Sequence, residues 1–333
     1  MTDPVARHRP KQYPPPEFPA RRPKLFARTP PAVFPAILGL LGLTLALRAG
    51  LRVLDLPQAA ADIAAGISLS LWGFAILAYL AKLARRPGSL ADDLRVLPGR
   101  AGLAAATVGG MAAAAVLTPF SPNLAVGLLI TALLLHAGLA LLLIRVLLHM
   151  PPEARRLNPT FHLSFVGQIV GALAALGLGF HAVAAVLFWA TLPVAVLIWA
   201  ISALRLRQDH PPPPLRPLLA IHATPAGVLA CVASLMGMHG LASALLLIAV
   251  AITLGLAVCA RWLVASGVSP LWGAFGFPLT AVTVAMLTVG GVWATPGILL
   301  LAVGCGAVPL VAWIVLKEWP GGRLAARTNA SEA

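Results

Sequence analysis

Long stretches without a charged residue alternate along this chain with short clusters of basic residues. The uncharged stretches are residues 101–144, 157–204, 217–260 and 262–316. A membrane span takes ~20 apolar residues, so each stretch can hold two helices and a tight turn. Turn-forming residues lie near the middle of each stretch: Pro119 and Pro122, Gly177 and Gly179, Gly237 and Gly240, and Gly290 and Gly291. The pattern therefore predicts helical hairpins that cross a membrane twice.

Residues 33–81 follow the same pattern, with Arg48, Arg52 and Asp55 at the turn. The chain then reads as five hairpins in series, a repeat architecture. The predicted spans are 33–49, 59–82, 101–118, 124–148, 159–178, 181–204, 217–236, 240–263, 270–289 and 296–316. The predicted fold class is an all-α polytopic membrane protein, with ten transmembrane helices arranged as five helical hairpins.

Composition excludes a soluble domain, because 59% of residues are hydrophobic and only 10% are charged, against ~25% charged in soluble proteins. The sequence also has no HExxH, no acidic pair on a predicted span and no Gly-rich phosphate loop followed by Lys. The three cysteines lie in apolar stretches without CxxC spacing. We therefore expect no enzyme activity, no metal site and no cofactor.

The net charge of +14 would suit a nucleic-acid-binding protein, but its placement argues against one. All Lys and Arg residues except Arg48 and Arg52 fall in the tails or in loops on one side of the predicted spans. Basic loops stay in the cytoplasm and face anionic lipid, so both termini are predicted to be cytoplasmic. Residues 1–30 should be a disordered, basic, Pro-rich tail, 31–317 the transmembrane domain and 318–333 a short cytoplasmic tail.

The odd-numbered spans carry helix breakers and small residues, whereas the even-numbered spans are rich in leucine. The breakers and small residues are Pro35, Gly39 and Gly42; Gly167 and Gly171; Pro225 and Gly227; and Gly273, Gly276 and Pro278. Small residues allow close helix contact, and a proline inside a membrane requires protein or a water-filled cavity beside it. The odd spans should therefore lie inside and the even spans outside. Weakly polar candidates to face an inner path are Thr44, Thr107, Ser164, Gln168, Thr224 and Thr280.

Two histidines lie near the cytoplasmic starts of inner spans, His162 on the fifth and His222 on the seventh. Imidazole titrates near neutral pH, so either residue could couple transport to protons. Hydrogen bonding between helices is the alternative role. The sequence alone does not decide between proton coupling and hydrogen bonding between helices.

Four motifs, in order along residues 31–316, resemble the tellurite-resistance/dicarboxylate transporter family, which includes bacterial TehA and the plant slow anion channels. They are Phe34-Pro35; Asn158 to Val170, which contains Phe165, Gly167 and Gln168; Leu215 to Ala226, which contains Thr224 and Pro225; and Trp272 to Pro278. The resemblance implies an anion channel or transporter in a bacterial inner membrane, with five hairpins around a central pore, an occluding phenylalanine and trimeric assembly. The chain departs from the family at Gln168, where Asn is usual, and at Ala172, where a proline is usual.

The candidate gate is Phe277, with Phe275 as the second candidate. Pro278 has no N–H to offer the carbonyl of Ala274, and this local break can turn the neighbouring ring toward the axis. An apolar ring in a narrow pore blocks ions by excluding water. The alternative interpretation is that Phe277 packs against a neighbouring helix as an ordinary core residue.

Two functions follow from these features. The first is an anion channel with a largely uncharged pore, which selects by size and ease of dehydration. The second is a proton-coupled carrier that exports an oxyanion such as tellurite or a C4-dicarboxylate.

Overall fold

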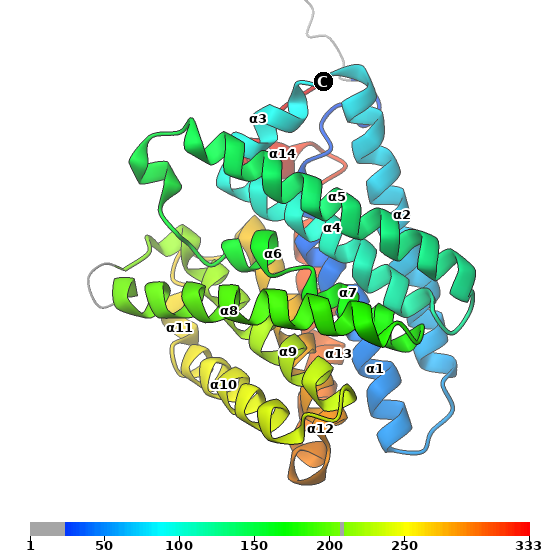
Figure 1. Ribbon diagram of the computed structural model, residues 1–333. Coiled ribbons are helices and arrows are strands. Elements are labelled where there is room, and N and C mark those ends of the chain that lie inside the picture. Colours follow the sequence, from blue (N-terminus) through cyan, green and yellow to red (C-terminus); the bar gives the residue numbers. More distant parts are fainter. Residues whose placement is uncertain (1–23, 207–209) are drawn as a thin grey trace, which may run out of the picture.

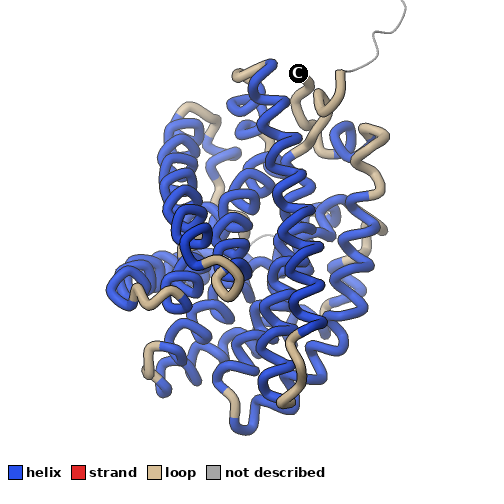
Figure 2. The backbone as a smooth tube through the Cα atoms, turned by 90° about the vertical axis from the view of Figure 1, so that its right-hand side faces the viewer, coloured by secondary structure: helices blue, strands red, loops and turns tan. Residues whose placement is uncertain are grey.

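The computed structural model describes residues 24–206 and 210–333, and these form a bundle of helices (Figures 1 and 2). The α-helices are α1 (Phe34–Val53), α2 (Ala59–Arg85), α3 (Ser89–Arg95), α4 (Leu97–Leu117), α5 (Pro122–Leu148), α6 (Phe161–Phe165), α7 (Ile169–Gly177), α8 (His181–Leu206), α9 (Ala223–Leu235), α10 (His239–Val258), α11 (Ala260–Leu263), α12 (Gly276–Val289), α13 (Ala294–Leu316) and α14 (Arg323–Arg327). Short 3₁₀ helices are η1 (Pro31–Val33), η2 (Pro152–Arg155), η3 (Pro213–His222), η4 (Pro270–Phe275) and η5 (Gly291–Trp293).

Within the described part of the chain, nine helical segments are long and apolar enough to cross a membrane. They are α2, α4, α5, α8, α10, and the continuous pairs η1–α1, η3–α9, η4–α12 and η5–α13. Large apolar side chains remain exposed on the outer helices, among them Leu134, Trp189 and Trp313. Such a surface is stable in lipid and not in water. The chain is therefore a helical membrane protein, as the sequence predicts.

The span predicted at 159–178 is not one continuous helix. It consists of α6 and α7, separated by Val166, Gly167 and Gln168. Here three successive amides bond to the carbonyl three residues back, at 2.9–3.1 Å, which tightens the backbone into a 3₁₀ turn. A Cβ on Gly167 would lie 2.3 Å from the carbonyl oxygen of Leu163, so this path requires glycine. The break explains why neither piece alone reaches the length of a span.

Five helices close into an inner ring. In order around the ring α1 packs on α4, α4 on α7, α7 on α9, α9 on α12, and α12 returns to α1. Each is followed in the chain by a helix packed on its outer side, namely α2, α5, α8, α10 and α13. The buried share is 67–89% for the inner segments that reach span length and 22–28% for the outer ones. The predicted division into inner odd helices and outer even helices is thus present.

Four of the five inner helices, all except α7, have a proline within their first three residues. Pro35 lies in the first turn of α1, Pro98 in that of α4, and Pro278 is the third residue of α12. Pro225 is the third residue of α9, which continues directly from η3. A proline in the first turn costs no hydrogen bond, since those amides have no partner within the helix. Pro35, Pro225 and Pro278, which the sequence marks as helix breakers, therefore lie where these helices begin.

The C-terminal residues are packed against the end of the bundle that carries the basic loops, called the basic end below (Figure 1). Lys82 of α2 and Asp93 of α3 form a fully buried ion pair, with 2.8 Å between Nζ and Oδ2. Tyr79 donates its hydroxyl to the same oxygen at 2.9 Å, and the amide of Ser331 donates to Oδ1 at 2.8 Å. Residues 318–333 are thus an integral part of the fold.

The tail predicted over residues 1–30 falls mostly outside the described residues. Its last seven residues, 24–30, are described, and Ala27 and Thr29 are buried. The carbonyl of Thr29 accepts a hydrogen bond from the Lys82 ammonium at 3.2 Å. The packed domain therefore begins a few residues earlier than the boundary predicted at residue 31.

Replacing Asp93 with Asn should strongly destabilise the protein, because it leaves the Lys82 ammonium buried without a counter-charge. One-sided loss of a buried pair costs about 3–5 kcal/mol. Asp92→Asn is the matched control, since Asp92 pairs with Arg86 and Arg95 at the exposed surface, where a pair contributes about 0–1 kcal/mol. Thermal unfolding in detergent, followed by size-exclusion chromatography, measures both. Equal losses of melting temperature in the two variants would contradict this account of Asp93.

Candidate functional site

Cavities follow one another along the axis of the inner ring. A cavity of about 750 Å³ opens at the end formed by the α1–α2 turn, called the far end below. Another of about 450 Å³ lies among the basic loops, at the basic end. Between them lie three small cavities, of about 30, 10 and 10 Å³. The two wide cavities thus face each other across a narrow central region.

The far-end cavity is surrounded by the last turns of all five inner helices. Its walls include Arg48 of α1, Thr118 after α4, Leu176 of α7, Leu235 of α9 and Thr288 of α12. The basic-end cavity is lined by the beginnings of α4 and η3 and by Asn158 and Pro159 before α6. The inner helices therefore run parallel, with their N-termini toward the basic end. Helix N-termini carry a partial positive charge and C-termini a partial negative charge.

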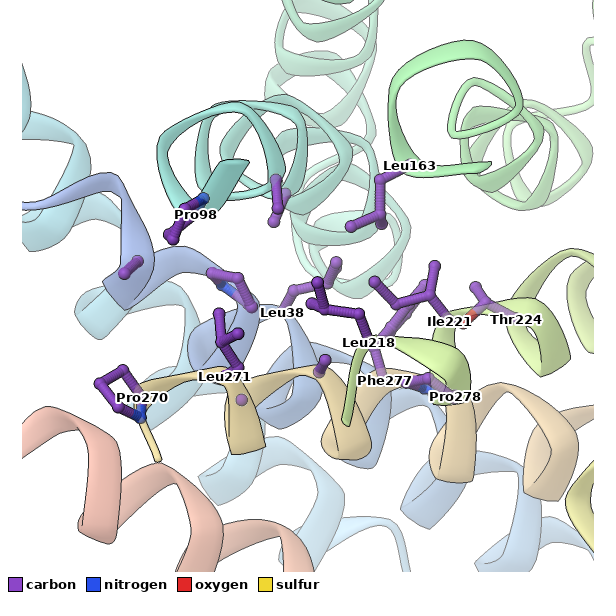
Figure 3. Close-up of a pocket in the computed structure, with 16 residues that line it drawn as sticks. Leu38, Pro98, Leu163, Leu218, Ile221, Thr224, Pro270, Leu271, Phe277 and Pro278 are labelled. Atoms are coloured by element: carbon purple, nitrogen blue, oxygen red, sulfur yellow. The ribbon is translucent and has the colours of Figure 1, made fainter. Parts of the chain in front are cut away.

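The cavity of about 30 Å³ is almost entirely apolar (Figure 3). The side chains that point into it come from different inner helices, among them Leu38 of α1, Leu163 of α6, Leu218 of η3 and Leu271 of η4. Leu218 also lines the basic-end cavity and so lies between the two. Thr224 is the labelled residue that brings a polar atom to this wall (Figure 3).

Phe277 lies where the small cavities meet. It lines all three of them, and only 5% of its surface is exposed. One cavity of about 10 Å³ lies toward the far end, because it shares Leu45, Leu173, Cys231 and Val284 with the far-end cavity. A cavity needs at least about 10–15 Å³ to hold one water molecule, so the space beside the ring cannot hold a hydrated ion. The axis is therefore narrowest where the small cavities meet, beside Phe277.

Close contacts between helices hold the phenyl ring of Phe277 in place. A Cβ on Gly39 of α1 would lie 3.0 Å from Cα of Gly276 on α12, so the two backbones nearly touch. One turn later, a Cβ on Gly42 would meet Cδ2 of Phe277 at 2.8 Å. On the other side, a Cβ on Gly227 of α9 would lie 2.9 Å from the backbone carbon of Ala281. Small residues of α1 and α9 thus let α12 approach the axis and leave room for the phenyl ring.

The structure gathers most of the predicted residues around this path. Pro35 and Pro278 line the cavity of about 30 Å³, Thr224 lines that cavity and one of about 10 Å³, and Gly167, Pro225 and His162 line the latter. Phe34, Phe165, Gln168 and Phe275 line none of these five cavities. Phe34 packs edge-on against Tyr79 of α2 with 6.2 Å between ring centres, Phe165 against Phe161 at 5.4 Å, and Phe275 against Trp272 at 6.3 Å.

Several weakly polar residues proposed for the path also lie elsewhere. Thr44 is 3.0 Å from the hydroxyl of Ser68 on α2, and Thr107 is 2.8 Å from Nδ1 of His136 on α5. These groups hydrogen-bond inner to outer helices. Thr280 does line a small cavity, beside Phe277. Sequence pattern placed these residues on the correct helices but could not assign their faces.

His162 and His222, considered separately in the sequence, form a hydrogen-bonded pair. Nε2 of His162 lies 3.0 Å from Nδ1 of His222, and both side chains are buried. Trp199 of α8 donates its indole N–H to the carbonyl of His222 at 3.0 Å, which fixes the junction between η3 and α9. His222 lines the basic-end cavity and His162 lines a small cavity beside Phe277. The pair therefore lies between the basic end and the narrow central region.

Sequence reasoning missed two features of the path. The first is its apolar lining of Leu38, Leu163, Leu218 and Leu271, which no motif distinguishes from ordinary core. The second is the presence of Arg48 and Arg52 on the wall of the far-end cavity. From the sequence, both arginines are predicted to lie at a turn, as exceptions to the charge asymmetry, with no part in the path. Their spacing of four residues on one helix was the available signal, since it places them on one face.

A ring of parallel helices around a narrow, mostly apolar axis is typical of a membrane channel or transporter. The model of the SLAC1 family, described as voltage-dependent anion channel, matches residues 28–317. The chain belongs to this family of anion channels and transporters, which confirms the resemblance drawn from its motifs. None of the curated proteins compared with the chain matches it.

Proposed function

We propose that this protein is an anion channel whose path is closed by the side chain of Phe277. The observation that carries the proposal is that this one ring borders all three small cavities between the two wide ones. Phe275, the second candidate, lines none of the five cavities and packs against Trp272. An apolar ring in an apolar constriction excludes water and therefore ions. Rotation of the ring, or its removal, would join the cavities.

Attraction for anions comes from the ends of the path. Arg156 and Arg205 line the basic-end cavity, where the inner helices also present their positive N-terminal ends. The central walls offer hardly any charge or hydrogen-bond donors to a dehydrated anion. Passage therefore favours anions that lose their water easily over anions that need specific ligands.

The same proposal includes the arrangement in the membrane. α6 and α7 together form a tenth span, so the chain crosses ten times as five hairpins around the pore. The basic end then faces the cytoplasm of a bacterial inner membrane, with both termini inside. The family resemblance supports assembly as a homotrimer, with one pore in each protomer.

Phe277→Ala should raise anion conductance at least about tenfold, which corresponds to removing a barrier of about 1.4 kcal/mol. The substitution removes the phenyl group that separates the small cavities and leaves the five inner helices in place. Planar-bilayer recording of the purified protein in a chloride or nitrate gradient measures the effect.

The matched control is Phe275→Ala, which removes the same ring two residues away, outside the path. It should leave the conductance near that of the unmodified protein. If Phe277→Ala assembles normally and stays closed while Phe275→Ala conducts, the gate has been assigned to the wrong residue.

The alternative is a proton-coupled carrier that exports an oxyanion such as tellurite or a C4-dicarboxylate. The observation that favours it is the His162–His222 hydrogen bond between the basic-end cavity and the narrow central region. Two imidazoles in such a position could take up a proton from one side and release it on the other.

For a channel, a pH gradient across liposomes should drive no net anion flux when the anion is equal on both sides and the voltage is clamped at zero. His222→Ala should then change only the size of the conductance. It should not change the coupling of anion flux to the pH gradient, because a channel has no such coupling. His149→Ala, a change at an exposed histidine that lines none of the five cavities, is the control. Uphill flux driven by pH in the unmodified protein, abolished in His222→Ala and kept in His149→Ala, would establish the carrier instead.

Cysteines placed at positions 122 and 210 should be labelled from opposite sides of the membrane. Pro122 lines the far-end cavity and His210 the basic-end cavity, so the pair tests the direction of the path. The background lacks the native cysteines, two of which, Cys259 and Cys305, are exposed. A membrane-impermeant maleimide, applied to intact cells, should reach only position 122. Labelling of position 210 under the same conditions would contradict the proposed orientation.

A further inference from the structure

Arg48 is a buried charged residue on the wall of the far-end cavity. It lies in the last turns of α1, lines the far-end cavity and is only 9% exposed. Its Nη2 donates to Oδ1 of Asp62 on α2 at 2.7 Å, and its guanidinium carbon lies 5.3 Å from the centre of the Phe120 ring. Its Nε is buried and has no hydrogen-bond partner among the described residues. The guanidinium is thus held in place with a donor unused.

The electrostatic setting explains why a cation is needed here. The last turns of all five inner helices surround the far-end cavity, and each has carbonyl groups without intrahelical partners. Their partial negative charge repels an approaching anion. Arg52 also lines the cavity, one turn beyond Arg48, and so does His181 at the start of α8. Asp62 faces Arg48 from α2, whereas Asp55 in the α1–α2 turn does not line the cavity.

We propose that Arg48, assisted by Arg52, forms an anion-binding site at the far-end mouth, and that its ligand is a small oxyanion or carboxylate. The planar guanidinium fits paired oxygen atoms better than it fits a spherical ion. The carboxylate of Asp62 already accepts a hydrogen bond on one side of the guanidinium, as the oxygen atoms of a carboxylate or oxyanion ligand would. The buried Nε leaves the guanidinium with a donor that no described residue satisfies, on a side chain that lines the cavity. Use of the site in permeation rests on the proposed channel function, but the binding itself does not.

Asp62 has two opposing effects in this site. Its hydrogen bond orients the guanidinium, and its negative charge weakens the attraction for an incoming anion. The Asp62 side chain is 43% exposed, so part of its charge is screened by solvent. An amide at this position can keep the hydrogen bond and remove the charge. Asp62→Asn should therefore strengthen anion binding, whereas Arg48→Gln should weaken it.

The first measurement is of binding to the purified protein in detergent, with Phe277 intact. Nitrate replaces the bulky anion HEPES at constant ionic strength, and the melting temperature is recorded against nitrate concentration. Arg48→Gln should raise the half-saturating nitrate concentration about tenfold, the size expected for one lost charge-assisted hydrogen bond. Asp62→Asn should lower it at least about twofold, and chloride should stabilise the protein less than nitrate does.

The control variant is Arg145→Gln, which removes an exposed arginine from the last turn of another helix, α5, outside the cavities. Its nitrate dependence should match that of the unmodified protein. If Arg48→Gln and Asp62→Asn shift the nitrate dependence in the same direction, the ion pair only holds α1 to α2 and the binding site does not exist. Loss of nitrate dependence in Arg145→Gln to the same degree would likewise overturn it.

The second measurement is of current in the Phe277→Ala background, with nitrate on the far side only. Adding Arg48→Gln should raise the nitrate concentration at half-maximal current entering from that side and leave entry from the basic end unchanged. If Phe277→Ala conducts and Arg48→Gln has no effect from either side, the site is wrong while the channel stands. If no variant conducts but nitrate binding still depends on Arg48, the channel is wrong while the site stands.

Discussion

The close contact of α12 with α1 and α9 determines the path through this protein. At Gly39 and Gly276 two helix backbones nearly touch, and at Gly227 a third approaches Ala281. Helices in lipid gain little from the hydrophobic effect, so they associate through such close packing. With α12 held this near the axis, the residue after Gly276 has its ring in the middle of the bundle. The position of the Phe277 ring in the middle of the bundle thus follows from glycine contacts at the preceding residue and one turn further along α12.

The same constraint separates two kinds of helix. Inner helices contain prolines and 3₁₀ turns, and the segment formed by α6 and α7 is interrupted. Such irregular segments leave backbone N–H and C=O groups without helical partners, and exposing these groups to hydrocarbon would be costly. The outer helices shield these irregular segments from lipid and expose leucine, valine and tryptophan themselves. Polar residues of the inner ring use their hydroxyls to bond the outer helices, as Thr44 does with Ser68. The path is therefore left with few polar groups, and charge is confined to its two ends.

Charge at the two ends has different origins. At the basic end, arginines and helix N-termini act in the same sense. At the far end, helix C-termini oppose an anion, and Arg48 and Arg52 offset them. The buried Lys82–Asp93 pair lies outside the path altogether and joins the C-terminal residues to α2 and α3. Buried charge in this protein thus serves both the assembly of one end of the bundle and the electrostatics of the other.

Sequence alone determined the membrane class, the approximate helices and the division into inner and outer sets, because these depend on hydrophobic length, on charge in loops and on the positions of glycine and proline. It also identified the helices of His162, His222 and Phe277, through motifs. Only the tertiary structure decided which faces meet: that Phe277 and not Phe275 borders the cavities, that the two histidines hydrogen-bond, and that Phe34 turns toward Tyr79. Nor could the pattern reveal the 3₁₀ break at Gly167, where a Cβ would collide with the carbonyl oxygen of Leu163. Hydropathy and spacing are properties of single segments, whereas the direction of a side chain within a helical bundle depends on the rotation of each helix against its neighbours.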